Sequence, residues 1–288
     1  MTVYFGLDSA RDARLFIPTF HTAYKVLPSW VGRYLGDFAL TPVERDWLHA
    51  QGIRILLCWN NVNAAIVAGT DGAAHATQAC AAAAALGAPA GTVIALDIET
   101  GWSPSSAFLH DFAGGVYLRG YVPVVYGNIY EAALRDPLIA AKNALGKDIG
   151  IWASEPEYYA WANVIRTDWT DFTQWLGTHA SLVWYHQYGE NEQGGIEDFD
   201  VATEVGYGKL FAPKAVTHQY TIRPATAGLK QTPSHTSPLA IGPNKMGVLL
   251  KVGQQVLPTG KTDHEWTEVR LPNSPVHGWL VTTDITVH

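Results

Sequence analysis

The sequence predicts an α/β fold in which a TIM-like (β/α) barrel precedes a small all-β barrel. Two observations support this prediction. About eight short apolar strands alternate with helix-like stretches over the first 210 or so residues, and after Lys214 the helical periodicity gives way to short strands separated by turn residues. An open doubly wound sheet is the main rival. It loses support because no GxGxxG follows a predicted strand and no GxxxxGK[ST] occurs.

The predicted strands of the first part are near-continuous runs of apolar, β-branched and aromatic residues, which are typical of a parallel sheet covered on both faces. They span residues 3–8, 30–35, 53–59, 93–98, 121–126, 149–153 and 182–188, with a short eighth strand near 199–202. The second part contains the candidate strands GLKQT, VLLKVG, QQVLP, EWTEVRL and HGWLVTT. We therefore place one domain at 1–212, a linker at 213–224 and a second domain at 225–288.

The clearest predicted helix lies between the second and third strands. Thr41 is expected to be its N-cap, Pro42 takes the first helical position, Glu44 completes a capping box and Gly52 ends the helix. The alanine-rich stretch 73–86 predicts a second helix, which Gly87 closes. Weaker helical patterns fall near 104–118, 129–145 and 168–178.

Composition and charge exclude several classes of protein. The chain of 288 residues is 48% apolar and 16% charged, which favours a packed core over disorder. Its net charge is −7, with no basic stripe, so nucleic acid is not expected as the main partner. The longest stretch without a charged residue, 72–96, is interrupted by Gly87, Pro89 and Gly91, and we expect no membrane insertion. Cys58 and Cys80 cannot form a disulfide scaffold, and we expect no cofactor, no metal and a monomer.

Carboxylates follow several of the predicted strands, where the reactive groups of an α/β barrel gather. Asp8 ends the first strand, Asp97 and Glu99 end the fourth, and Asp200 lies on the eighth. Asp97 and Glu99 are two residues apart, so both point to one face of an extended strand. Paired carboxyl groups repel each other, so one tends to keep its proton and act as an acid while the other stays ionised, as glycosidic cleavage requires.

These acids also have structural alternatives. Asp8 could cap the helix that follows it, with Ser9 as helper. Asp97 or Glu99 could be a solvated strand end, and Asp200 lies in an acidic segment, where simple solvation is the alternative. Glu155 also follows a strand, and for it we favour a role in loop structure.

Aromatic and amide side chains crowd the same strand ends. Aromatic rings stack on the apolar faces of sugars, whereas amides can hydrogen-bond hydroxyl or acetamido groups. The candidate substrate-binding residues are Trp59, Asn60, Trp102, Tyr126, Trp152, Gln187 and Tyr188. Packing in the core or at the rim is the alternative for any single aromatic residue, and His186 is expected to be a hydrogen-bonded structural histidine. Other chemistries are disfavoured because no GxSxG elbow occurs and HEWTE lacks the second histidine of an HExxH zinc site.

A series of motifs in the first 212 residues resembles a known family. GLDSAR, VGRYLG, LTPVERDWLHAQGIRILLCW, VIALDIE, VPVVYGN and IWAS occur in that order. Together they resemble the glycoside-hydrolase-like domain of unknown function 1906, which is related to the family-25 lysozymes, muramidases that cleave peptidoglycan. The segment 225–288, with Trp266–Val269 and Gly278–Trp279, resembles a bacterial SH3-like domain of the kind attached to cell-wall hydrolases.

The resemblance implies a barrel with irregular last strands and an acidic groove. It implies that Glu99 is the general acid and that Asp97 stabilises positive charge or orients the substrate acetamido group. Asp8 and Asp200 would be supporting carboxylates, and Gln187 and Tyr188 would match the Gln-Tyr of the seventh strand. His186 and the insert GENEQGGIEDF depart from the family pattern.

We therefore expect a muramidase-like glycosidase that cuts the glycan strand of bacterial peptidoglycan and is targeted by its SH3-like domain. A non-catalytic glycan-binding protein on the same barrel is the alternative, and action on another polysaccharide is a third reading. The N-terminal MTVYFGLDSARDAR does not have the pattern of a Sec signal peptide. We expect synthesis in the cytoplasm and action at the cell wall, as a phage-type lysin or after export by another route.

Overall fold

The computed structural model describes residues 2–154, 165, 168–191 and 197–213, together with seven strands of the C-terminal part. The chain divides into two compact units, Met1–Lys214 and Ala215–His288.

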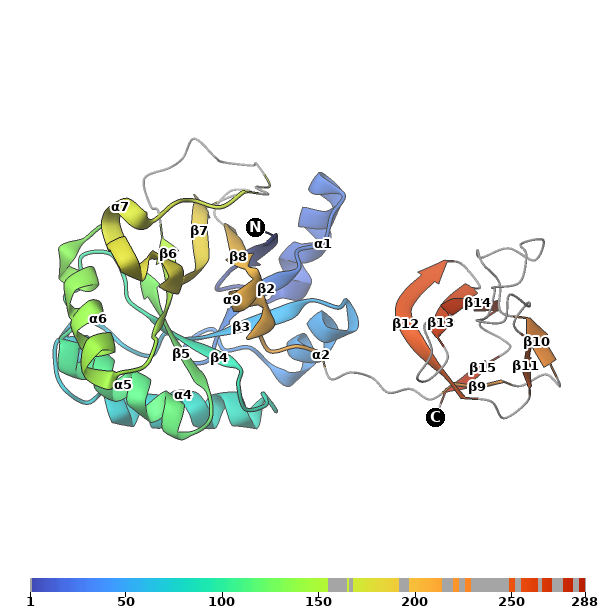
Figure 1. Cartoon of the computed structure of the whole chain (residues 1–288), viewed down its shortest axis with the longest axis horizontal. Coiled ribbons are helices and arrows are strands. Elements are labelled where there is room, and N and C mark those ends of the chain that lie inside the picture. Colours follow the sequence, from blue (N-terminus) through green and yellow to red (C-terminus); the bar gives the residue numbers. More distant parts are fainter. Residues whose placement is uncertain are drawn as a thin grey trace. The chain divides into compact units, whose positions relative to one another are not determined.

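The first unit is a closed barrel of eight strands that lie side by side in sequence order (Figure 1). Strands β1 to β7 run parallel, whereas β8 pairs antiparallel with both β7 and β1. The TIM-like barrel with irregular last strands is thus confirmed. The strands are β1 (Val3–Asp8), β2 (Trp30–Tyr34), β3 (Arg54–Trp59), β4 (Val93–Asp97), β5 (Val122–Gly127), β6 (Gly150–Ser154), β7 (Val183–Asn191) and β8 (Glu197–Thr203).

Helices surround these strands. The longer ones are α1 (Ala13–Tyr24), α2 (Pro42–Ala50), α4 (Gly72–Ala85), α5 (Ser106–Leu118) and α6 (Ala132–Leu145). The short ones are α3 (Ala64–Val67), α7 (Thr173–Leu176), the 3₁₀ helix η2 (Gly177–Leu182) and α9 (Glu204–Gly208). Of these, α2, α4, α5, α6 and α7 fall in the intervals where the sequence predicts helices. A helix was expected after the first strand, as the one that Asp8 could cap, but no bounds were predicted for α1, whose helical pattern is interrupted by Pro18.

Helix α2 begins and ends as its sequence predicts. The Thr41 hydroxyl accepts the Glu44 backbone N–H at 3.2 Å, and Gly52 follows the helix with a positive φ of 76°. The Glu44 side chain does not complete the expected capping box. It is buried instead and pairs with Arg33 of β2.

Two hydrophobic layers hold the barrel together. The larger layer lies between the strands and the helices and contains residues such as Leu57, Leu96 and Phe112. The smaller one contains inward-facing residues of the strands, among them Cys58 and Ala95. Aromatic rings form the floor of this interior, where Trp30, Trp152 and Tyr185 contact one another with ring centroids 5.5–6.5 Å apart.

Every element that the structure describes in the second unit is a strand. The strands are β9 (Tyr220–Ile222), β10 (Thr226–Gly228), β11 (Leu249–Lys251), β12 (Gln255–Asp263), β13 (Trp266–Arg270), β14 (His277–Val281) and β15 (Ile285–Val287). They form one sheet in the order β14-β13-β12-β9-β15 and a pair, β10-β11. This agrees with an all-β second part, and its SH3-like character remains a prediction.

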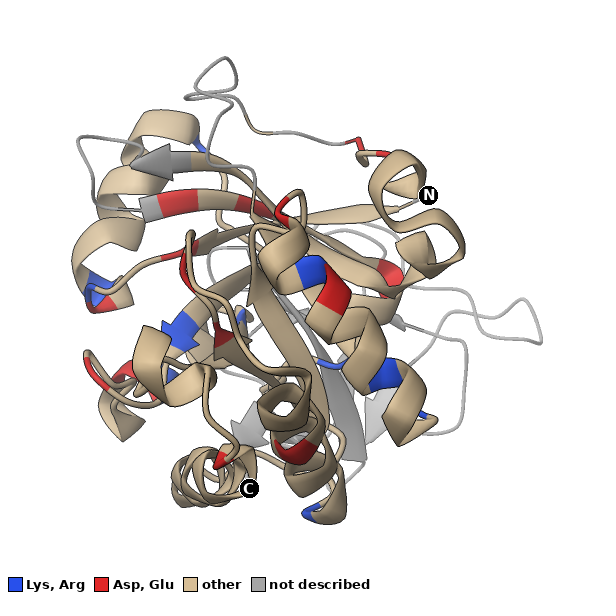
Figure 2. Cartoon of the chain, turned by 90° about the vertical axis from the view of Figure 1, so that its left-hand side faces the viewer, with Lys and Arg blue, Asp and Glu red and all other residues tan. Residues whose placement is uncertain are grey.

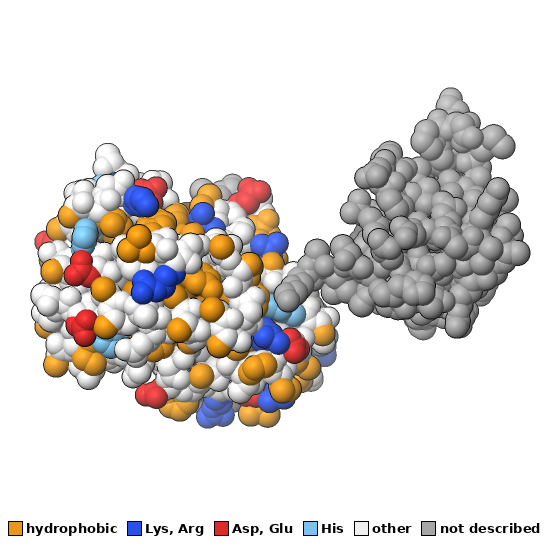
Figure 3. Space-filling view, turned by 90° about the horizontal axis from the view of Figure 1, so that it is seen from below, with side chains coloured by type: hydrophobic (Ala, Val, Ile, Leu, Met, Phe, Trp, Pro, Cys, Tyr) orange, Lys and Arg blue, Asp and Glu red, His pale blue; other side chains and the backbone are white. Residues whose placement is uncertain are grey.

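The surface of the first unit mixes residue types. On the face shown in Figure 3, hydrophobic side chains are interspersed with charged and polar ones. Among the described residues, no helix combines the length and the hydropathy needed to cross a membrane.

Candidate active site

Strand register brings the acids of distant sequence segments to one end of the barrel. Asp8 is the last residue of β1 and lies opposite Asp198 of β8, while Asp97 ends β4 and lies beside Tyr126 of β5. Asp200 lies one pleat deeper on β8, opposite Gln187 of β7. Figure 2 shows acidic positions on strands as well as on the outer helices. The carboxyl end of the barrel, where the reactive groups of this architecture gather, therefore carries a cluster of acids.

A chain of hydrogen bonds links β5, β7, β8 and β1. The Tyr126 hydroxyl donates to Gln187 Oε1 at 2.6 Å. The Gln187 amide then donates from Nε2 to Asp8 Oδ2 at 3.2 Å and to Asp198 Oδ2 at 3.0 Å. Gln187 is buried and its amide uses both its oxygen and its nitrogen, so it orients two carboxylates and a phenol at once. The predicted site residues Tyr126 and Gln187 thus lie among the acids.

Asp8 and Asp200 form a buried carboxyl pair. Asp200 is fully buried, and its Oδ1 accepts the indole N–H of Trp152 at 2.8 Å. Burial is the main cause that raises the pKa of Asp8 well above its usual range, followed by the charges of Asp200 and Asp198. Burial likewise raises the pKa of Asp200, and a hydrogen bond from Asp8 opposes that rise. Burial and mutual repulsion therefore both oppose the simultaneous ionisation of the two carboxyl groups.

Asp97 and Glu99 lie in contrasting environments. Asp97 is 7% exposed, and burial, with a further contribution from the charge of Glu99, raises its pKa to about 8. Glu99 lies two residues beyond it, after the end of β4, and is exposed. At neutral pH, Asp97 is therefore mostly protonated. Glu99, in contrast, is exposed and accessible to a ligand. Two neighbouring carboxyl groups with different environments are the usual basis for separate acid and base roles.

The interior around the acids leaves no room for a side chain at Gly32 of β2. A Cβ at Gly32 would lie 2.7 Å from Asp8 Cβ and 3.0 Å from Trp152 Cη2. Glycine at this position lets the strand approach both side chains closely. Cys58 lies nearby, and burial raises the pKa of its thiol well above its usual range, so it is a neutral thiol.

The predicted aromatic residues divide between the interior, the rim and the outer layer. Trp152 lies in the interior, almost fully buried, and positions Asp200 rather than offering a face to a ligand. Trp59 and Tyr188 point outward into the layer between strands and helices, where the Trp59 indole N–H contacts His75 Nδ1 at 3.3 Å. Their assignment to substrate binding was therefore wrong, because both are core residues. Trp102 is partly exposed in the loop after β4 and can still meet a ligand.

Asn60 has a structural role that the sequence analysis did not anticipate. Its Oδ1 accepts the Gly36 N–H at 3.1 Å, and its Nδ2 donates to the Asp37 carbonyl at 3.0 Å. The side chain thus ties the loop after β3 to the loop after β2, and its amide is engaged there instead of being available to a substrate.

Three alternative readings from the sequence can also be judged. Asp8 does not cap α1, because Asp12 takes that position and accepts the Arg14 N–H at 3.0 Å. Asp200 is not a solvated loop acid. His186 is fully buried and its Nδ1 lies 3.2 Å from the Thr170 hydroxyl, as expected for a structural histidine. Glu155 lies outside the described residues.

Asp198 was not predicted as a site residue, because it lies in the acidic insert GENEQGGIEDF, where solvation was the simpler interpretation. Its spacing from Asp200 gives the missing signal. The two are separated by one residue on an extended strand, so they share a face just as Asp97 and Glu99 do. Among the described residues, no group of three or more His, Cys, Asp or Glu is arranged to hold a metal ion.

Comparison with known proteins agrees with this architecture. A crystal structure of an uncharacterised B. stearothermophilus protein aligns with a TM-score of 0.63 and 21% identity, covering 72% of this chain and all of the other. The Mycobacterium tuberculosis Tat-secreted protein Rv2525c, in complex with L-tartrate, aligns with a TM-score of 0.50 and 16% identity, covering 73% and 99% of the two chains. At such identities the likeness establishes the fold alone.

The modular autolysin LytC from Streptococcus pneumoniae aligns less well, with a TM-score of 0.41 and 15% identity over 70% of this chain and 47% of that one. A TM-score of this size carries no argument about function. No curated protein matches the sequence. The family model of the Rv2525c-like, glycoside hydrolase-like domain matches residues 28–231, which is well over half of the chain. The chain therefore belongs to the Rv2525c-like glycoside hydrolase-like domain family.

Proposed function

We propose that the barrel unit is a glycosidase that cleaves the glycan strand of bacterial peptidoglycan in the manner of a muramidase. The observation that carries the proposal is the Asp97–Glu99 pair at the carboxyl end of β4, with one member buried and mostly protonated and the other exposed. Membership of a glycoside hydrolase-like family supports the same class of reaction. The cell wall as the place of action, and targeting by the SH3-like second unit, are parts of this proposal.

The reaction needs a proton for the glycosidic oxygen as its bond to the anomeric carbon breaks. Glu99 is the member of the pair that a bound glycan can touch, and we assign proton delivery to it. Asp97 supplies the proton reserve, because its raised pKa keeps it protonated near neutral pH. A water molecule then adds to the anomeric carbon and returns a proton to the pair, so hydrolysis leaves both carboxyl groups in their starting state.

The buried carboxyl groups around Asp8 have a supporting role. Asp8, Asp198 and Gln187 form a hydrogen-bonded wall beside the pair, and a negative charge on that wall favours the positive charge that develops at the anomeric carbon. Trp152 fixes Asp200 beneath this wall. Rigid support of this kind is what a preorganised site requires.

The experiment incubates the full chain with purified peptidoglycan and identifies released fragments by mass spectrometry. We expect muropeptides with new reducing ends from the wild type and none from Glu99→Gln. The variant Asp97→Asn should retain binding and lose most of the activity at neutral pH. Full activity of Glu99→Gln would refute its assignment.

The alternative function is binding of glycan without cleavage. It predicts that neither the wild type nor Glu99→Gln releases fragments, whereas both sediment with the insoluble wall. Parallel digestion of chitin-type substrates separates muramidase action from action on another polysaccharide, because only the latter would release oligosaccharides from them.

A further inference from the structure

The loop between β2 and α2 displays an aromatic ring to solvent. Phe38 is 68% exposed, and it is the aromatic member of the exposed large hydrophobic residues in the described part of the chain. Its backbone has a φ of 58°, in the left-handed region that any residue with a Cβ avoids. Lys25 also has a positive φ, but it ends α1, where a left-handed cap is usual. Phe38 lies instead in a turn within the loop, away from any helix end.

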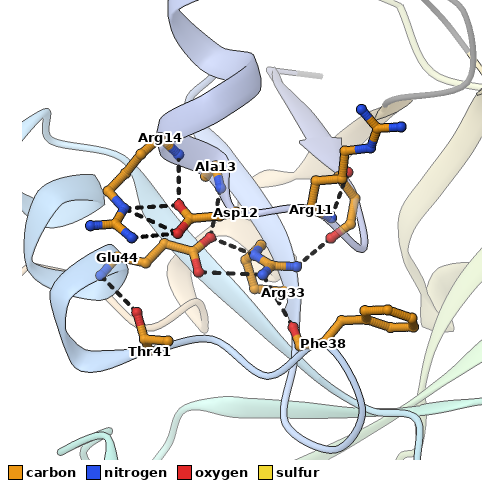
Figure 4. A network of polar contacts seen from close by, with 9 residues as sticks. Arg11, Asp12, Ala13, Arg14, Arg33, Phe38, Thr41 and Glu44 are labelled. Atoms are coloured by element: carbon orange, nitrogen blue, oxygen red, sulfur yellow. Dashed lines mark hydrogen bonds and ion pairs between the residues drawn. The ribbon is translucent and has the colours of Figure 1, made fainter.

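A buried ion pair holds the backbone of Phe38 in place (Figure 4). Arg33 donates from Nη2 to the Phe38 carbonyl at 3.2 Å, and from Nε to Glu44 Oε1 at 2.6 Å. The same guanidinium donates to the carbonyl of Ser9, and Glu44 accepts the N–H of Ala13 at 2.8 Å. The side chains of Arg33 and Glu44 are 2% and 1% exposed. One buried network thus fixes the loop after β2 to the loop that follows Asp8 in the chain.

A second clamp fixes the residues that precede Phe38. Asn60, from the end of β3, binds the N–H of Gly36 and the carbonyl of Asp37 through its amide. The Leu40 N–H donates to the Tyr34 carbonyl at 2.8 Å and closes the loop on the other side. The loop is therefore held from β1, β2 and β3, and the Phe38 ring extends away from the Arg33 guanidinium in Figure 4.

The exposed ring and the left-handed backbone of Phe38 both destabilise the fold, and no packing contact among the described residues compensates for them. An exposed phenyl ring gains little from the hydrophobic effect, and its backbone conformation is unfavourable for a residue other than glycine. Glycine at this surface position would adopt the same backbone conformation without strain. Backbone strain held by a buried network is found at sites that bind ligands, because it presets a side chain for contact.

We propose that Phe38 is a stacking platform for a sugar ring at the rim of the carboxyl end of the barrel. This inference deepens the proposed function and rests on it. The loop follows β2, whose Gly32 lies beside Asp8, so the platform belongs to the same end of the barrel as the acids. The flat apolar face of a phenyl ring is complementary to the C–H face of a pyranose, and a preset ring loses little freedom on binding.

The test measures binding of a soluble peptidoglycan glycan oligomer, in which N-acetylglucosamine and N-acetylmuramic acid alternate, by calorimetry, with the full chain carrying Glu99→Gln so that the ligand is not cleaved. Three further variants are compared in that background. Phe38→Gly removes the ring and suits a φ of 58°, Phe38→Trp keeps an aromatic face, and Leu118→Ala is the matched control. Leu118 is 86% exposed at the end of α5, which leads into the start of β5 and so lies at the opposite end of the barrel.

We expect Phe38→Gly to weaken binding about tenfold or more, Phe38→Trp to bind within about threefold of the parent, and Leu118→Ala to bind like the parent. Thermal unfolding of Phe38→Gly should occur at the same or a higher temperature, because glycine removes the strain. Unchanged affinity in Phe38→Gly would overturn the platform and leave the glycan site standing. No binding by the parent at millimolar oligomer would overturn the platform and the proposed function together.

Discussion

Replacing Asp97 with asparagine tests the electrostatics at the centre of the proposed site. Burial raises the pKa of this carboxyl from 3.8 to about 8, so the folded protein holds a proton there that the unfolded chain releases above about pH 4. Whenever the folded state binds more protons than the unfolded state, stability falls as the pH rises. Wild-type stability should therefore decline between about pH 4 and pH 8, and Asp97→Asn should lack this part of the decline.

The magnitude follows from the shift. About four pKa units at about 1.36 kcal/mol each give an upper bound of about 6 kcal/mol at pH 8, and about half of that at pH 6. In a unit of this size, 1 kcal/mol moves the unfolding midpoint by about 2–4 °C. We therefore expect the wild type to lose about 10 °C more than Asp97→Asn between pH 4.5 and pH 8.

The assay follows thermal unfolding of the full chain by tryptophan fluorescence at fixed ionic strength. Asp8 and Asp200 also have raised pKa values, but both remain in the variant, and the charge of Asp97 is only the smallest of the causes that raise the pKa of Asp8, so most of their contribution is common to both proteins. Asp71→Asn is the matched control, because Asp71 is exposed and its side chain makes no capping hydrogen bond to α4. Glu99→Gln should flatten the wild-type profile partly, since the charge of Glu99 is the second cause of the shift. Parallel curves for the wild type and Asp97→Asn would refute the reasoning.

Three further substitutions probe the network around the acids. Arg33→Met leaves the Glu44 carboxylate buried without its ion-pair partner and should lower the free energy of unfolding, measured in urea, by about 3–5 kcal/mol. The double variant Arg33→Met/Glu44→Gln should recover much of this loss, because it removes the unpaired charge. Gly32→Ala places a Cβ against Asp8, so it should lower the free energy of unfolding by about 1–3 kcal/mol and abolish glycan cleavage. Unchanged stability of this variant would contradict the close approach of β2 to Asp8. Gln187→Glu adds a carboxyl group beside Asp8, and the pKa of this new group should be raised. The variant should therefore approach wild-type stability near pH 4 and lose stability as the pH rises. Thermal unfolding midpoints at pH 4.5 and pH 7.5 would reveal this loss.

The sequence predicted most of the barrel because its strands are nearly uninterrupted apolar runs. The range 3–8 matches β1, and the remaining barrel strands begin and end within two residues of the predicted bounds, apart from the longer C-terminal end of β7. The bounds of α1 were not predicted because local signals weaken at Pro18, whereas the packing of residues such as Phe16 and Phe20 stabilises the helix in the fold.

The candidate site was predictable as far as strand parity reaches. The rule that acids gather on and after the barrel strands found Asp97 and Asp200. The alternation of side chains along a strand would have added Asp198, which faces the same side as Asp200. It would also have excluded Trp59, which alternates with the inward-facing Cys58. Phe38 could not be found in this way, because its importance depends on a left-handed backbone and on a buried pair formed in the tertiary structure.

One structural cause links the chemistry of this site to its cost in stability. The aromatic floor of Trp30, Trp152 and Tyr185 keeps water out of the barrel interior and so creates the environment in which carboxyl groups hold protons at neutral pH. The same exclusion of water penalises every carboxylate that ionises there, so a more stable barrel would carry apolar residues or amides at Asp97 and Asp200. Retaining acids at such positions is understandable if their protons are used. For this reason Asp97→Asn should gain stability at neutral pH and lose glycan cleavage in one step, and a variant that gained stability without losing activity would separate the buried acid from the reaction.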